Sequence, residues 1–202
     1  MFPMRFTPDR KFHPDWPEDG LSEGVFMTSR DGIRWDRRFM EAFLRPGPDP
    51  ENWNERNMIV AAGVVPTGPR EISLYYVEHY RRASVRLRRA TLRTDGFVSV
   101  HASDRSGSFV TKPLVFAGDE LVINYETSAS GSIQVEVQNE NGQTIEGFWL
   151  TRSEKIFGDE IEHVVKWSDD SDLGALAGQT VRLRFVLQDA DLYSLRFRES
   201  TP

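Results

Sequence analysis

The chain has 202 residues, of which 39% are hydrophobic and 11% aromatic, so it is long and apolar enough to bury a core. It carries 25 Lys and Arg against 31 Asp and Glu, and the net charge of −6 disfavours nucleic acid and anionic membranes as partners. Because there is no cysteine, disulfides, thiolate zinc sites and cysteine nucleophiles are excluded.

The N-terminal 20 residues contain no apolar run that could form the core of a signal peptide. No run of about 18 apolar residues, the length of a membrane-spanning helix, occurs anywhere in the chain. We therefore expect a soluble chain, cytoplasmic as written, or exported if an upstream portion is missing. No sequence feature indicates a cofactor, and we expect none.

Short runs of alternating apolar and polar residues, separated by Gly, Asn, Asp and Pro turns, indicate an all-β fold. We expect strands at residues 72–77, 85–92, 97–101, 121–125, 132–138, 144–150, 163–167, 181–187 and 192–197. A turn at Ser130-Gly131 and a hairpin or bulge at residues 188–194 separate neighbouring strands. The only helical segment expected is one turn at residues 173–176.

Residues 29–35 read S-x-D-G-x-x-W, a pattern typical of a tight hairpin turn. In such a turn Asp31 accepts backbone N–H bonds, Gly32 takes a positive φ and Trp35 packs beneath. This structural role is favoured, and direct ligand contact by Asp31 is the alternative.

Proline is dense before residue 80, whereas beyond it strands recur about every ten residues, as in a β-sandwich. We therefore expect two domains, residues 1–83 and residues 84–202, with the β-sandwich second.

From Gly20 onward the chain contains the segments GLSEGVFMTSRDGIRWDR, NWNERN, GPREISLYYVEHY and GSFVTKPLVFAGDELVINYETSASGSIQVEVQNENGQTIEGF. Together they resemble the C-terminal part of five-bladed β-propeller proteins related to glycoside hydrolase families 32 and 43. The resemblance implies a last propeller blade followed by an antiparallel, jelly-roll-like β-sandwich, and it implies carbohydrate as the partner.

A propeller blade takes roughly 40 to 50 residues and a ring needs roughly four or more blades. Residues 1–83 can therefore supply only one or two blades, and we expect an incomplete propeller. Missing N-terminal blades or a companion chain would complete it. In the resembled families the three catalytic acidic residues come from earlier blades, so no catalytic residue is assigned here.

Residues 52–57, NWNERN, could line a sugar-binding cleft. Trp53 offers a flat face to a sugar ring, and Asn54, Glu55 and Arg56 offer hydrogen bonds to hydroxyls. The alternative, which we favour, is a hydrogen-bonded lock between the loops of the blades. Glu78 and His79, at the end of the strand at residues 72–77, are further substrate-binding candidates, with local hydrogen bonding as their alternative.

Two charged clusters have simpler explanations than ligand binding. The arginines between residues 81 and 93 alternate with apolar residues, which favours an arginine face paired to carboxylates over a nucleic-acid site. Asp119, Glu120 and residues 169–172 suggest calcium, but a solvated acidic loop is favoured because no EF-hand spacing is present, and no metal ligand is assigned.

Three functions are compatible with the sequence. The favoured one is the non-catalytic C-terminal portion of a glycoside hydrolase-like protein that supports or completes a sugar-binding cleft. The alternative is a stand-alone carbohydrate-binding or structural β-sandwich module without enzymatic activity. The third is a truncated remnant that folds without any activity.

Overall fold

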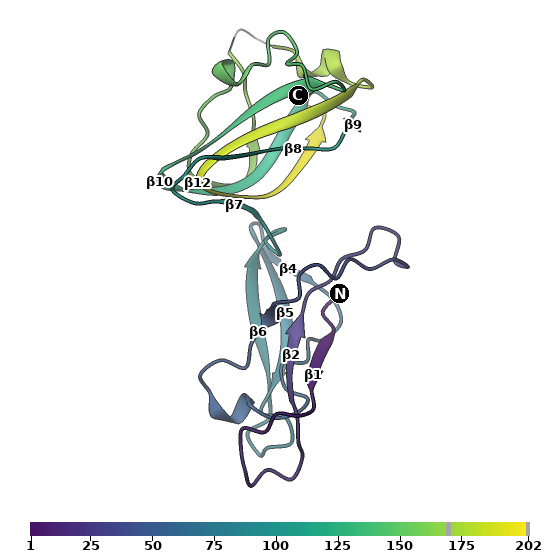
Figure 1. Cartoon of the computed structure of the whole chain (residues 1–202), viewed down its shortest axis with the longest axis vertical. Coiled ribbons are helices and arrows are strands. Elements are labelled where there is room, and N and C mark those ends of the chain that lie inside the picture. The colour runs from purple at the N-terminus through teal and green to yellow at the C-terminus, as the bar shows by residue number, and fades with distance from the viewer. Residues whose placement is uncertain (169–170, 201–202) are drawn as a thin grey trace. The chain divides into compact units, whose positions relative to one another are not determined.

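The computed structural model describes residues 1–168 and 171–200 (Figure 1). Strands form three antiparallel sheets, none of them closed, and the described residues include no α-helix. The all-β class is thereby confirmed. Within the same residues no helix has the length and hydrophobicity needed to cross a membrane.

The chain divides into two compact units, Met1–Leu92 and Arg93–Pro202. The sequence placed the domain division earlier, after residue 83. The residues between the two positions form most of a strand that pairs within the first unit's sheet. The division into a propeller segment and a sandwich stays a prediction.

The first unit contains two three-stranded sheets, each in sequential strand order. The strands of the first sheet are β1 (Met4–Thr7), β2 (Leu21–Val25) and β3 (Ala42–Leu44). Those of the second are β4 (Val65–Gly68), β5 (Glu71–Glu78) and β6 (Arg86–Arg93). A 3-10 helix, η1 (Pro50–Asn52), lies between the two sheets in sequence.

The core of the first unit contains packed aromatic rings and a tightly packed glycine. Phe26 stacks on Phe43, with ring centroids 5.6 Å apart, and Phe2 packs against both rings. Gly24 in β2 is tightly packed, because a Cβ there would lie 3.3 Å from both Leu44 Cβ and the Met58 carbonyl oxygen. The segment around Met58 pairs in turn with β5, since the Met58 N–H donates to Val77. The β1–β3 sheet therefore packs closely against the edge of the second sheet.

The second unit is built on one six-stranded sheet dominated by two very long strands, β10 and β12 (Figure 1). Its strands are β7 (Val100–Ala102), β8 (Gly107–Val110), β9 (Leu114–Val115), β10 (Glu120–Asn139), β11 (Asp159–Val164) and β12 (Thr180–Arg198). Two 3-10 helices, η2 (Leu150–Arg152) and η3 (Leu173–Leu176), complete it. The helical turn expected at residues 173–176 coincides with η3.

The expected turn at Ser130-Gly131 is wrong, because β10 continues through it. Pairing with β12 runs from Glu120 opposite Arg198 to Asn139 opposite Val181, with a register shift between Thr127 and Ser132. Gly131 permits this bulge, since a Cβ there would lie 2.2 Å from the carbonyl oxygen of Asp189. The strands expected at residues 121–125 and 132–138 are therefore both part of β10, and those expected at residues 181–187 and 192–197 are both part of β12.

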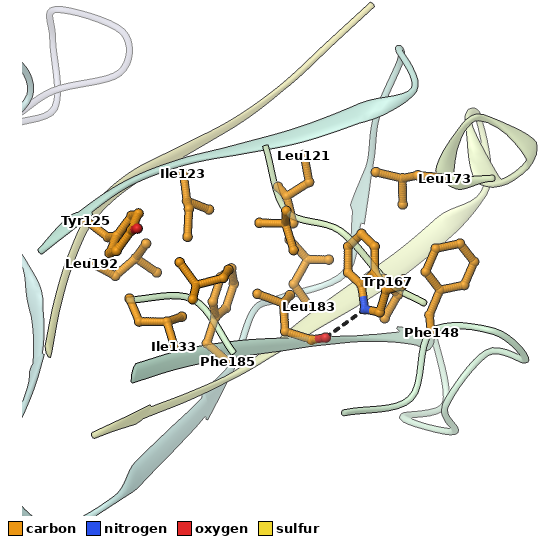
Figure 2. Close-up of a cluster of buried hydrophobic side chains, with 14 of the residues drawn as sticks. Leu121, Ile123, Tyr125, Ile133, Phe148, Trp167, Leu173, Leu183, Phe185 and Leu192 are labelled. Atoms are coloured by element: carbon orange, nitrogen blue, oxygen red, sulfur yellow. Dashed lines mark hydrogen bonds between the residues drawn. The ribbon is translucent and has the colours of Figure 1, made fainter. Parts of the chain in front are cut away.

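The core of the second unit lies along these two strands (Figure 2). Trp167 donates its indole N–H to the Val135 carbonyl at 2.8 Å and meets Phe148 edge to face. The strand expected at residues 144–150 is wrong, because only Thr144 forms a β-bridge there. Gly147, with φ of +89°, turns the chain so that Phe148 points into the core.

Candidate functional site

The turn at residues 29–35 is held by Ser29 and Asp31. The Asp31 carboxylate accepts the backbone N–H groups of Ile33 and Arg34 at 2.9 and 2.7 Å, and these bonds lower its pKa. Gly32 has φ of +74° and donates its N–H to Ser29 Oγ, while Trp35 is half-buried. All of these bonds lie within the turn, so the Asp31 carboxylate has a structural role.

Three asparagines tie the segment after η1 to the end of β5. Asn57, which is fully buried, accepts the Tyr80 N–H at 2.7 Å and donates to the carbonyls of Glu51 and Asn52. Asn52 accepts the His79 N–H and donates to Pro46. Asn54, also buried, donates to the Tyr80 carbonyl at 3.1 Å and accepts from Asn57. We call Asn52, Asn54 and Asn57 the asparagine lock.

The asparagine lock holds a strained piece of backbone. Four non-glycine residues beside it have positive φ near +60°, a conformation that L-residues rarely adopt: Arg56, Met58, His79 and Arg81. The hydrogen bonds of the lock fix the peptide groups next to two of these residues, His79 and Arg81, through the His79 N–H and the Tyr80 N–H and carbonyl. At these two positions buried side-chain amides therefore offset the strain.

His79 is buried between two acidic side chains. Its Nε2 lies 2.9 Å from Asp49 Oδ2, and its Nδ1 lies 2.9 Å from Ser84 Oγ and 3.0 Å from Glu51 Oε2. The hydrogen bond from His79, followed by one from the Glu51 N–H, lowers the pKa of Asp49. None of the described cavities is lined by His79 or Ser84. His79 thus joins η1 to the β5–β6 turn.

Glu78 is likewise occupied inside the molecule. Its Oε2 accepts from Arg86 Nε at 2.8 Å and lies 3.6 Å from Arg88, and its Oε1 accepts from Tyr76 OH. Arg89 pairs with Glu71 in the same sheet. This arrangement is the arginine face paired to carboxylates that the alternating sequence favoured.

Glu55 and Arg56 line a cavity of about 350 Å³. Glu55 is buried, accepts the Trp16 indole N–H at 2.8 Å, and has its other oxygen 3.1 Å from Arg81 without the geometry of a hydrogen bond. The exposed Arg56 guanidinium lies over the Tyr80 ring. The charges at this cavity are largely paired with one another, since Glu18 also pairs with Arg81.

Trp53 lines a different cavity, of about 270 Å³, which we call the Trp53 cavity. Residues from three separate segments surround it: Thr7, Arg10, Leu21, Ser22, Glu23, Arg45, Pro46, Gly47 and Trp53. The indole N–H donates to the Gly47 carbonyl at 2.8 Å, and Phe12 packs against the ring with centroids 5.4 Å apart. The orientation of the indole is therefore fixed before any ligand arrives.

Among the sequence-predicted residues, only Trp53 reaches this cavity. Asn54 is buried in the asparagine lock, His79 is buried beside it, and Glu55 and Arg56 face the other cavity. The rest of the wall has no local sequence signal, because pairing of Thr7 with Leu21 across β1 and β2 brings its segments together. Such pairing depends on the tertiary fold.

The acidic residues proposed for calcium have protein partners. Asp119 accepts both the N–H and the hydroxyl of Ser200, and Glu120 accepts from Arg198 at 2.7 Å. Asp169 and Asp170 lie outside the described residues. Within residues 1–168 and 171–200, no group of three or more His, Asp or Glu side chains is arranged to hold a metal ion.

Comparison with protein families, with curated proteins and with solved structures found no match. The function must therefore be argued from the site alone.

Proposed function

We propose that the chain is the non-catalytic C-terminal portion of a glycoside hydrolase-like, carbohydrate-active protein, and that its contribution is a sugar-binding cavity at Trp53. The observation that carries this proposal is a rigidly held indole in the wall of a cavity that also presents hydroxyl and charged groups. Sugar rings have apolar faces that pack on aromatic side chains, and hydroxyl groups that need hydrogen bonds.

The size of the Trp53 cavity agrees with such a ligand. About 270 Å³ lies just below the range of roughly 300 to 1,000 Å³ typical of small-molecule sites. A volume of this size suits one sugar ring of a longer chain better than a large cofactor.

The architecture supports the remainder of the proposal. The sequential strand order of the two consecutive sheets agrees with the order of strands within a propeller blade, although each sheet has three strands where a blade normally has four. The second unit has its own core along the long β10–β12 pair, as a separate sandwich domain would, although its strands belong to a single six-stranded sheet. Missing N-terminal blades or a companion chain would complete the propeller and supply the catalytic carboxylates.

The proposal is tested by binding of neutral and acidic oligosaccharides to the full chain on a glycan array, followed by titration of each retained glycan. We expect Trp53→Ala to weaken binding about tenfold or more, because the stacking surface is lost. Trp149→Ala, which removes a partly exposed indole from the second unit, serves as the matched control and should bind normally. Retention of no glycan, or full affinity in a folded Trp53→Ala variant, would contradict the proposal.

A structural module without sugar binding is the second candidate. It is favoured by the burial of Asn54, Glu55, Glu78 and His79, four of the six predicted substrate-binding residues, in contacts within the protein. An array that retains no glycan would select this candidate.

A further inference from the structure

The charge of the Trp53 cavity is opposite to that of the whole chain. Arg10 follows β1 and Arg45 follows β3, and both line the cavity with Glu23 as its only acidic wall residue. The protein as a whole carries a net charge of −6. The positive charge of these two guanidinium groups is therefore confined to the cavity and does not reflect the charge of the whole chain.

Glu23 does not neutralise these two arginines, because another arginine already binds it. Arg5, the cross-strand partner of Glu23 in the β1–β2 sheet, donates from both Nε and Nη2 to Glu23 Oε1, with the Nε bond at 2.6 Å. Among the residues that the structure describes, neither Arg10 nor Arg45 has a carboxylate within 4.0 Å or a side-chain hydrogen bond. Both arginines are exposed residues.

The other charged regions of the first unit differ in this respect. Arg81, at the neighbouring cavity, pairs with Glu18 and Glu55, each at 3.1 Å. Arg86 and Arg89 on β6 pair with Glu78 and Glu71. At the neighbouring cavity only Arg56 lacks a carboxylate partner among the described residues, and its guanidinium lies over the Tyr80 ring, whereas two arginines without such carboxylate partners line the Trp53 cavity.

From these contacts we infer that the Trp53 cavity takes an acidic sugar, a uronic acid residue whose ring packs on Trp53 and whose carboxylate binds Arg10 and Arg45. A guanidinium group presents paired N–H donors in the plane that a carboxylate accepts, and charge-assisted bonds of this kind are stronger than neutral ones. The inference rests on the proposed function, since it names the class of sugar that the same site would take.

Polar groups on the wall can serve the ring hydroxyls. The Thr7 hydroxyl has no hydrogen bond within the described part of the chain, so it is available as donor and acceptor. Ser22 is buried and donates to the Asn57 carbonyl at 2.8 Å, so only its acceptor capacity remains. The cavity therefore offers two guanidiniums for a carboxylate and few neutral groups for hydroxyls, which favours a charged ring over a neutral one.

The test compares sugars that differ only at C6. Methyl glycosides of glucose, galactose and mannose are titrated against the full chain by calorimetry, beside the corresponding uronates and 6-sulfates. We expect at least one uronate to bind about tenfold or more tightly than its neutral counterpart, from the net strength of hydrogen bonds between charged groups. Raising the salt concentration to about 0.5 M should reduce the uronate affinity and leave neutral binding unchanged.

Variants then assign the preference to the two arginines. Arg10→Gln and Arg45→Gln should each remove most of the preference for the uronate, and Arg45→Lys should retain charge but lose the paired N–H geometry. Arg34→Gln, which changes an exposed arginine in the 29–35 turn outside the cavity, is the matched control. Far-ultraviolet circular dichroism establishes that each variant is folded.

The outcomes separate this inference from the proposed function. If neutral glycosides bind as tightly as uronates, or if the arginine variants keep the preference, the acidic-sugar inference is overturned and the sugar-binding function stands. If 6-sulfates bind more tightly than uronates, the carboxylate assignment is overturned. If no sugar of any kind binds and none is retained on the array, both fail together.

Discussion

Replacing Asn57 by alanine tests whether the asparagine lock stabilises the first unit. Asn57 is fully buried and accepts the Tyr80 N–H at 2.7 Å, so the variant leaves that donor without its partner. A buried donor or acceptor left unsatisfied costs about 1–3 kcal/mol, and the carbonyls of Glu51 and Asn52 lose a donor as well. We expect a loss of about 2 kcal/mol in the free energy of unfolding.

The assay is urea unfolding of the full chain, followed by tryptophan fluorescence. With a denaturant slope of about 2 kcal/mol per molar urea, the transition that reports the first unit should move down by about 1 M. Asn141→Ala, at an exposed position of the second unit, is the matched control and should leave both transitions in place. An Asn57→Ala midpoint within about 0.2 M of wild type would refute the assignment of these amides to a stabilising lock.

Two further predictions concern the turn and the tyrosines. Asp31→Ala removes the acceptor for two backbone N–H groups, so we expect the variant to unfold at a lower urea concentration than the wild type, with little change in sugar affinity. A folded, equally stable variant with lost affinity would instead make Asp31 a ligand-binding residue. Burial raises the pKa of both Tyr125 and Tyr193 to about 12, from 10.0. Because the pKa of each of these tyrosines is higher in the folded state than in the unfolded state, their contribution to stability is present below pH 10 and lost as pH rises through about 12. Absorbance titration at alkaline pH should show that two tyrosines ionise late. Ionisation of both near pH 10 in the folded protein would contradict this prediction.

The all-β class could be predicted because it depends on local alternation. The strand expected at residues 72–77 is contained in β5, and the turn residues around Asp31 and Gly32 have their roles within one short segment. Continuity of β10 could not be predicted, since Ser130-Gly131 has the composition of a turn. It becomes a bulge only because Thr127 and Ser132 on either side pair with β12.

Of the residues that line the candidate site, only Trp53 could be predicted from the sequence. Trp53 stands out because a tryptophan among polar residues is unusual, whereas Arg10 and Arg45 look like ordinary surface arginines until the folded chain brings them together. The polarity of the neighbours of Trp53 is compatible with both ligand contact and the favoured hydrogen-bonded lock. Asn54 belongs to the lock, because it is buried and donates to the Tyr80 carbonyl.

The β10–β12 pair has a consequence for the order in which the second unit folds. Glu120 and Arg198 are neighbours in the sheet although 78 residues separate them in the chain. The fully buried residues of β10, such as Ile133 and Val135, have their partners on β12, so little of this core can form until the last strand has been synthesised. During translation the edge of β10 that pairs with β12 must wait unpaired, although β11 can already pair with the other edge. Deletion of β12 should therefore leave this edge exposed and prone to aggregate.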